Sequence, residues 1–426
     1  MNRRIKSLSD IEIVLRPYIK LVKKLTGKDT TLERIKPLMS FLGHPENNIR
    51  TIHIAGTSGK TSTAYYISSL LSQSGNKVGL TISPHVDKIN ERVQINNRPL
   101  NESIFCEQLE KFLKLVQQSG IKPSYFELMC SFSIWLFDKY KVDYAVIETG
   151  VGGLYDATNV INNEDKICVI TDIGFDHMSL LGNTIEEITS QKIGIVHDHN
   201  DLLMYQQSPQ IMSVINNWVK VHNDHLHLIK ENQERENFKN IKSFKNLPDF
   251  QKRNWLLAYS VYRFIAQRDS LKSLDIQQIE ESQQIIIPAR MDKRISNNKI
   301  IIMDGAHNFQ KMSSFISSYI NQYPNTKPAI LLAFKNDKDY LQTLPLIKNL
   351  ASEIIVTTFK TSQDLPVLST DPEEIANQLL KIGTKNVSVE KDNMKAYIKL
   401  LKSSSKHLII TGSFYLISQV RSKISK

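Results

Sequence analysis

A glycine-rich segment, Gly56-Thr57-Ser58-Gly59-Lys60-Thr61-Ser62, separates the strand-like run TIHIAG from a stretch with helical periodicity. Glycines allow backbone N–H groups to close around phosphate oxygens, Lys60 can reach the β- and γ-phosphates, and a helix start adds positive potential. The segment is shorter than the eight-residue P-loop pattern, because Ile54 stands where that pattern has its first glycine. The sequence predicts an ATP phosphate loop, and an ordinary glycine-rich turn is the alternative.

Candidate metal ligands follow two other predicted strands. Glu148 ends the run YAVIE, and Asp176 and His177 follow the run ICVIT. Ligands of α/β proteins bind at the carboxyl ends of parallel strands, and Mg²⁺ prefers oxygen ligands, so Glu148 is a candidate for holding it. A glutamate that caps the next turn is the alternative, and an Asp-His pair is more often structural than catalytic.

Lys192 lies fifteen residues after His177, in a predicted helix. A solvated lysine paired with a nearby glutamate is the simpler interpretation of this residue. A buried lysine with a lowered pKa could instead react with CO₂ to form a carbamate, which is a carboxylate-like metal ligand.

The segment DGAHN, Asp304 to Asn308, follows the run KIIIM in the C-terminal part of the chain. An aspartate at a strand end commonly accepts a hydrogen bond from a ribose hydroxyl, and His307 and Asn308 would begin the next helix. The same residues could form only a turn and a helix N-cap.

Strands and helices alternate along the chain, which predicts a parallel sheet covered on both faces. Strands are expected at TIHIAG, KVGLTI, YAVIE and ICVIT, with helices near 10–25, 31–43, 61–74, 101–118, 125–140 and 249–268. After Arg294 come strands KIIIMD, PAILLAF, EIIVTTF and HLIITG, with helices near 308–321, 373–382 and 393–403. The polar stretch 222–247 is expected to be a surface excursion, and the III before Pro288 a strand.

Two α/β domains are therefore predicted. Residues 1–294 would form a P-loop-type domain, with a mostly parallel sheet flanked by helices. Residues 295–426 would form a smaller, Rossmann-like α/β domain.

The composition excludes several classes of protein. The chain has 426 residues, 41% hydrophobic and 23% charged, which excludes wholesale disorder. It has no run of about 18 apolar residues and no apolar signal region, so neither membrane insertion nor secretion is expected. The net charge of +11 is scattered, without interleaved aromatics, which disfavours nucleic acid as a partner. Three cysteines without metal or redox spacing indicate a reducing cytoplasm.

The motifs, in their order, resemble the folylpolyglutamate synthase/dihydrofolate synthase family, a branch of the Mur-type amino-acid ligases. The resemblance covers nearly the whole chain. It rests on HIAGTSGKTS, SPHVDKINERVQIN, SYFE, IETGVGGLYDATNV, DIGFDHMSLLGNTIEEITSQKIGI, QKRNWLLA, PARMD, MDGAHN, DKD and TGSFYL. It implies that the first domain binds ATP, like the central domain of Mur ligases, and that the second is the glutamate-ligase domain.

The resemblance also implies a role for individual residues. Lys60, His177 and Lys192 would be the catalytic residues, and Lys60 and its loop would hold the ATP phosphates. Ser83 and Glu148 would bind one Mg²⁺, and His177 and Lys192, as a carbamate, would hold a second. The further nucleotide contacts would be Asn254, Arg290, Asp304 and His307. The pterin-side pocket would comprise Asp29 to Leu32, Ser124, Tyr125, Phe126, Glu127, Tyr155, Asp156 and Ala157.

The implied reaction is ATP-dependent ligation of L-glutamate to the carboxylate of a folate, through an acyl phosphate. The acceptor would be tetrahydrofolate, dihydropteroate or both, and the protein a monomer with no nucleic-acid or membrane partner. The family usually has GKG, GGRLDATN and PGR where this chain has GKT, GGLYDATN and PAR. Because Leu154 and Tyr155 fall in the pterin-side segment, a Mur-type ligase with another acceptor is one alternative. A P-loop ATPase that makes no ligated product is another, and a nucleic-acid ATPase would need an aromatic and basic platform.

Overall fold

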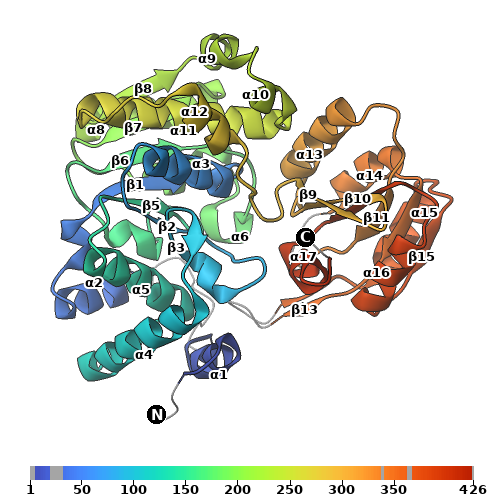
Figure 1. Ribbon diagram of the computed structural model, residues 1–426, viewed down its shortest axis with the longest axis horizontal. Helices are drawn as coiled ribbons and strands as arrows, with labels where there is room; N and C mark the ends of the chain where they lie inside the picture. The colour runs from blue at the N-terminus through green and yellow to red at the C-terminus, as the bar shows by residue number, and fades with distance from the viewer. Residues whose placement is uncertain (1–4, 20–31, 337–339, 362–366, 425–426) are drawn as a thin grey trace. The chain divides into compact units, whose positions relative to one another are not determined.

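The computed structural model describes residues 5–19, 32–336, 340–361 and 367–424, which form two compact α/β units (Figure 1). Unit 1 takes in residues 1–245 and 251–285, and unit 2 residues 246–250 and 286–426, within the described ranges. The predicted boundary after residue 294 falls inside strand β9 (Asp292–Ser296). This strand pairs with β10 (Lys299–Asp304), and residues 286–294 therefore lie with unit 2.

Unit 1 contains an eight-stranded sheet in the order β4-β3-β2-β5-β1-β6-β7-β8. The strands are β1 (Arg50–Ala55), β2 (Val78–Thr81), β3 (Val93–Ile95), β4 (Arg98–Pro99), β5 (Tyr144–Glu148), β6 (Ile167–Ile170), β7 (Asp201–Tyr205) and β8 (His225–Ile229). Strands β2, β5, β1, β6, β7 and β8 run parallel, whereas β3 and β4 pair antiparallel at one edge. The central strands are buried apolar runs, as expected for parallel strands covered on both faces.

The helices of unit 1 cover both faces of this sheet. They are α1 (Leu8–Ile19), α2 (Leu32–Phe41), α3 (Lys60–Gln73), α4 (Glu102–Ser119), α5 (Tyr125–Lys139), α6 (Met178–Leu181), α7 (Ile185–Ile193), α8 (Pro209–His222), α9 (Glu231–Phe238), α10 (Lys242–Asn246), α11 (Asp249–Arg268) and α12 (Ile276–Gln283), with 3₁₀ turns η1 (Pro45–Asn48), η2 (Ile89–Arg92) and η3 (Ala157–Val160). Helices α1, α2, α4 and α5 share one apolar core with Ala145 and Ile147 of β5. Helix α3 lies on the opposite face of the sheet (Figure 1).

Strand β1 is the point at which the order of the strands reverses. The chain passes from β1 to β2 on one side, with β5 between them, and β6 lies on the other side of β1. In open α/β sheets a ligand crevice forms at the carboxyl ends of the strands at such a point. The segments after β1, β5 and β6, where the sequence predicts functional residues, all begin at this edge.

Two of the predicted elements are wrong. Residues 222–247 are not a surface excursion, since β8 pairs with β7 in the sheet and α9 and α10 follow it. Phe238 and Phe244 anchor these helices edge-on against Trp255, and such sparse aromatic anchors leave little periodicity to detect. The III before Pro288 is not a strand. Helix α1 ends at Ile19, and the rest of the helix predicted over 10–25 lies outside the described residues.

Unit 2 contains a six-stranded sheet in the order β15-β12-β11-β16-β10-β9, in which only the edge strand β9 is antiparallel among the described pairings. The further strands are β11 (Ala329–Leu332), β12 (Glu353–Val356), β15 (Val387–Val389) and β16 (His407–Thr411), with a separate pair β13 (Lys360–Thr361) and β14 (Val367–Leu368). The helices are α13 (Phe309–Gln322), α14 (Leu344–Leu350), α15 (Pro372–Lys381), α16 (Asn393–Leu401) and α17 (Phe414–Arg421), with the 3₁₀ turn η4 (Leu341–Thr343). The predicted pair of parallel α/β folds is thus confirmed. Among the described residues, no helix is long and apolar enough to cross a membrane.

Candidate active site

The glycine-rich segment connects β1 to α3, with Gly59 as the N-cap of the helix. Gly56 and Gly59 have φ angles of +146° and +93°, which side chains with a Cβ rarely adopt. A Cβ would also lie 1.9 Å from Oγ1 of Thr171 at the first position and 2.5 Å from Oδ1 of Asn254 at the second. Conformation and close packing both require glycine here, and the first turn of α3 then presents N–H groups and positive potential to an anion.

The loop is fastened to the segment that follows β6. The N–H groups of Thr57 and Ser58 donate to the carbonyl oxygen of Asp172, at 2.8 and 3.1 Å. The hydroxyl of Thr57 donates to the carbonyl oxygen of Gly174 at 2.9 Å. These bonds join two segments that are far apart in sequence, and the second one continues to His177.

Two lysine ammonium groups meet at the phosphate loop. The Nζ atoms of Lys60 and Lys192 donate to the same acceptor, the carbonyl oxygen of Gly56, at 3.0 and 3.1 Å. Lys192 comes from the last turn of α7 and is only 3% exposed. It is therefore not the solvated surface lysine of the simpler interpretation. Two cations on one carbonyl concentrate positive charge where polyphosphate would lie.

Glu148 brings three predicted residues together at the carboxyl end of β5. Its carboxylate is buried and accepts from the hydroxyl of Thr61 at 2.8 Å and from the N–H of Ser83 at 3.2 Å. A buried carboxylate and a hydroxyl side by side at a phosphate loop are the hard oxygen donors that Mg²⁺ takes. The residues present therefore fit a magnesium ion.

His177 and Asn254 are the other predicted site residues of unit 1 near these segments. His177 begins α6 with a left-handed backbone, and its Nε2 lies 3.9 Å from Oδ1 of Asp176. Asn254, on α11, places its side-chain oxygen against Gly59 of the loop. The residue that the resemblance assigns to the nucleotide thus lies beside the glycine-rich loop, although it comes from a helix far along the chain.

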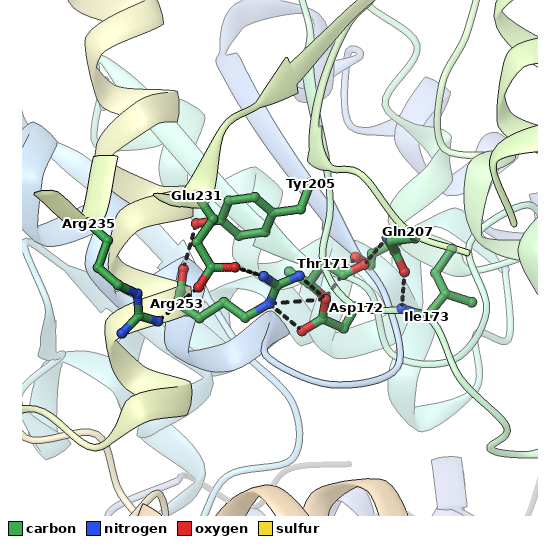
Figure 2. Close-up of polar contacts among 9 residues, drawn as sticks. Thr171, Asp172, Ile173, Tyr205, Gln207, Glu231, Arg235 and Arg253 are labelled. Atoms are coloured by element: carbon green, nitrogen blue, oxygen red, sulfur yellow. Dashed lines mark hydrogen bonds and ion pairs between the residues drawn. The ribbon is translucent and has the colours of Figure 1, made fainter. Parts of the chain in front are cut away.

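The structure also reveals a polar cluster that the sequence analysis missed (Figure 2). The Asp172 carboxylate accepts from Nε of Arg253 at 3.0 Å and from its Nη2 at 2.7 Å. The side-chain amide of Gln207 binds both Thr171 and Ile173, on either side of Asp172. Arg253 directly precedes Asn254 in the motif QKRN, which was the available signal.

The segment GGLYDATN supports helix α7. A Cβ on Gly153 would lie 2.7 Å from the carbonyl oxygen of Gln191 and 2.8 Å from that of Lys192. The N–H of Leu154 donates to the carbonyl oxygen of Gln191 at 2.7 Å, and a Cβ on Gly194 would lie 2.5 Å from the Leu154 side chain. This segment therefore fixes the end of the helix that carries Lys192.

A pocket opens beside Glu148 and Ser83, on the side of the predicted pterin-binding residues. Its lining consists of Thr81, Ile82, Ser83, Arg92, Phe126, Met129, Cys130, Glu148 and Thr158. Of the residues predicted for the pterin side, Phe126 lines this pocket. Glu127 is instead fully buried in an ion pair with Arg34 at 2.7 Å, and it also closes a capping box with Ser124.

The remaining pterin-side residues have varied environments. Asp156 caps η3 by accepting from the N–H and hydroxyl of Thr158, and burial raises the pKa of Asp156 while these hydrogen bonds oppose the rise. Tyr155 is 45% exposed, whereas Tyr125 and Ala157 are buried. Leu32 begins α2 and packs on the core, and Asp29 lies outside the described residues.

Unit 2 has its own cluster of predicted residues at the carboxyl ends of β10 and β16. Asp304 is buried and accepts from the N–H groups of Met291 and Ala306, both at 2.9 Å. Burial raises the pKa of Asp304 to about 6, and the Arg290 guanidinium opposes part of that rise.

The aromatic ring of Phe414 covers this cluster. The Arg290 guanidinium lies 4.3 Å from the centre of the ring, and the ring of His307 is 5.8 Å away, edge-on. A Cβ on Gly305 would lie 1.9 Å from the ring, so the glycine of DGAHN is required by packing. From the sequence, Phe414 was noted only as part of the motif TGSFYL, and no role was predicted for it.

Comparison with known proteins agrees with this architecture. A family model described as the Mur ligase middle domain matches residues 54–256, and one described as the dihydrofolate synthetase C-terminal domain matches residues 285–423. With the phosphate loop and the two α/β units, these matches define an ATP-dependent ligase of the Mur type. The dihydrofolate synthase/folylpolyglutamate synthase of Bacillus subtilis is 29% identical, over 93% of this chain and 96% of its own length.

Two solved structures share the fold. The folylpolyglutamate synthase of Mycobacterium tuberculosis complexed with ADP has a TM-score of 0.83 at 22% identity and covers 98% of each chain. The bifunctional folylpolyglutamate synthase/dihydrofolate synthase of Yersinia pestis, complexed with AMPPNP and a Mn ion, has a TM-score of 0.80 at 21% identity and covers 99% of each. Along nearly its whole length the chain is similar to folylpolyglutamate synthases and dihydrofolate synthases.

Proposed function

We propose that this protein uses ATP and Mg²⁺ to join L-glutamate to the carboxylate of a folate, either tetrahydrofolate or dihydropteroate. The observation that carries the proposal is the convergence of Lys60, Lys192, Thr61 and Glu148 at one phosphate loop. The names of the Bacillus subtilis relative and of the two solved structures support the folate acceptor, and their bound ligands support a nucleotide with a divalent metal.

Amide formation from a carboxylate is uphill in water, so the acceptor must first be activated. Its carboxylate oxygen attacks the γ-phosphorus of ATP, and the bond between that phosphorus and the β–γ bridging oxygen breaks. ADP departs, and the acceptor is now an acyl phosphate. The glutamate amine then attacks the acyl carbon, loses a proton and expels phosphate. Lys60 and the first turn of α3 offset the negative charge shared by carboxylate and γ-phosphate as they approach.

We assign the metal ligands to residues around the loop. Glu148 and the hydroxyl of Ser83 would hold one Mg²⁺, and His177 and Lys192 a second. A bound ion would offset negative charge on the phosphates. Lys192 is buried and would act through its deprotonated amine. That amine can add to CO₂ and lose a proton, and the resulting carbamate is an anionic ligand.

We assign nucleotide contacts to Asn254 in unit 1 and to Arg290, Asp304 and His307 in unit 2. The acceptor would enter beside Phe126, in the pocket that Glu148 and Ser83 also line. Tyr155 is the exposed pterin-side residue, so we propose that it contacts the acceptor. We further propose that the protein is a monomer and that it is cytoplasmic. The three buried free thiols support only the second proposal, since they suit a reducing compartment.

Mass spectrometry of the products tests this proposal. The protein is incubated with ATP, Mg²⁺, L-glutamate and either dihydropteroate or tetrahydrofolate, with Lys60→Ala as the inactive control. A gain of one glutamate on dihydropteroate, or serial gains on tetrahydrofolate, is the expected result. Phosphate release that needs neither glutamate nor acceptor would instead show an ATPase. No gain on either acceptor, with ATP binding intact, would point to a Mur-type ligase of another acceptor.

A further inference from the structure

The polar cluster in Figure 2 connects helices α9 and α11 and strand β7 to the segment that follows β6. Arg253, near the start of α11, binds the carboxylate of Asp172 through Nε and Nη2, and its Nη1 binds the carboxylate of Glu231 at the start of α9. The ring of Tyr205, at the end of β7, lies 4.2 Å from the guanidinium carbon, and its hydroxyl donates to the backbone oxygen of Arg253. Arg235 binds the same glutamate at 2.8 Å.

This arrangement fixes the guanidinium on several sides. Two carboxylates and an aromatic face leave Arg253 little rotational freedom, and alternating charges in a network hold each other better than an isolated surface pair does. The Arg253 and Asp172 side chains are 28% and 31% exposed, so the pair is only partly screened by solvent.

Asp172 transmits that fixed position to the phosphate loop. Its side chain is held by Arg253, while its backbone oxygen accepts from Thr57 and Ser58 of the loop. Gln207 holds the peptide groups on both sides of Asp172, so the segment cannot turn away from the loop without breaking those bonds.

We propose that Arg253 is a positioning residue for ATP, acting through Asp172 to keep the phosphate loop in its nucleotide-binding conformation. A loop already ordered loses less conformational freedom when the nucleotide binds, so the contact increases affinity for ATP without touching it. This inference rests on the proposed use of ATP at this loop, and it adds two residues to that site.

The same helix provides a matched control. Arg263 also lies on α11 and also pairs with a glutamate of α9, Glu234, at 3.1 Å. Its side chain is 56% exposed, and no described contact joins it to Asp172 or to the loop. Arg263→Gln removes an ion pair between the same two helices, so it separates loss of helix packing from loss of the contact to Asp172.

The test measures binding of AMPPNP with Mg²⁺ by calorimetry, together with kcat and KM for ATP and for L-glutamate. Arg253→Gln and Asp172→Asn should each weaken AMPPNP binding and raise the KM for ATP about fivefold to tenfold. We expect kcat and the KM for glutamate to stay within about twofold. Arg253→Lys should recover part of the affinity, and the double variant should be no weaker than either single one, since both remove one interaction.

Unchanged AMPPNP affinity in Arg253→Gln, an equal loss in Arg263→Gln, or additive losses in the double variant would each overturn the proposal. If Arg253→Gln does not fold, the AMPPNP affinity of Asp172→Asn alone tests the proposal. This isosteric substitution removes the carboxylate charge but keeps the backbone oxygen that accepts from the loop. The binding measurement needs no acceptor. If Arg253→Gln weakens AMPPNP binding but the protein makes no folate product, the proposed function is refuted and the positioning role of Arg253 is not.

Discussion

Gly153→Ala should slow the chemical step through a shift of α7. The glycine has no left-handed conformation to preserve, so the effect comes from space alone. An added Cβ would lie 2.7 Å from the carbonyl oxygen of Gln191 and 2.8 Å from that of Lys192, whereas ordinary contact begins at 3.4 Å. The end of α7 must therefore retreat by about 0.6 to 0.7 Å.

That displacement moves Lys192, which the proposed mechanism uses as a metal ligand. Overpacking of this size costs about 1–3 kcal/mol of unfolding free energy. A misplacement approaching 1 Å at reacting groups lowers kcat by roughly tenfold to a hundredfold. We expect kcat to fall within that range while affinity for AMPPNP stays within about twofold, because the nearest atoms to the new methyl group belong to Gln191, Lys192 and Ile195 and not to the loop at residues 56–62.

The assay is steady-state phosphate release with acceptor and glutamate, combined with urea unfolding. Gly120→Ala is the control, since Gly120 has a φ of +69° with nothing within 4 Å of a new Cβ. This substitution costs a comparable free energy, about 1–2 kcal/mol, through backbone strain at the end of α4. A Gly153→Ala protein with normal kcat, or an equal loss of kcat in Gly120→Ala, would refute the reasoning.

Three further predictions follow from the site. Lys60→Ala should abolish phosphate release, because the loop loses the cation aimed at the phosphates; near-normal turnover would exclude that role. Lys192→Ala should be nearly inactive and partly rescued by short carboxylic acids, which replace a carbamate, and a fully active variant would make Lys192 dispensable. Burial raises the pKa of Asp304 from 3.8 to about 6, so the folded state holds its proton more tightly. Stability should therefore decrease as pH rises from about 4 to about 6, by up to about 3 kcal/mol more than in Asp304→Asn. A free energy of unfolding, measured with urea, that changes equally with pH in the two proteins would contradict the raised pKa of Asp304.

Much of the fold and part of the site could be predicted because their signals are local. The phosphate loop at 56–62 combines a strand, two glycines and a helix start within one short stretch, and Glu148 ends an apolar strand. Alternation of strands and helices then places such strand ends at one edge of a parallel sheet. The structure puts Thr61, from the loop, in contact with Glu148 accordingly.

The environment of a residue was harder to predict where its side chain could either bind a ligand or stabilise the fold. Glu127 belongs to a motif that resemblance assigns to the pterin side, yet in the structure it is buried against Arg34 and caps its own helix. Residues 222–247 looked like solvent-exposed chain because β8 is an edge strand, and edge strands carry exposed polar side chains. Composition reports average exposure and does not show which partner a side chain meets.

The sequence by itself determined that a glycine-rich loop with a lysine follows a buried strand, that an acidic residue ends the neighbouring strand, and that two α/β folds follow each other along the chain. Only the tertiary structure decided that Lys192 is buried at Gly56, 136 residues away, and that Arg253 holds Asp172, 81 residues away. Backbone conformation and apolar periodicity depend on neighbouring residues, so they are written locally. Contacts between distant segments depend on how whole elements pack, and no short pattern encodes them.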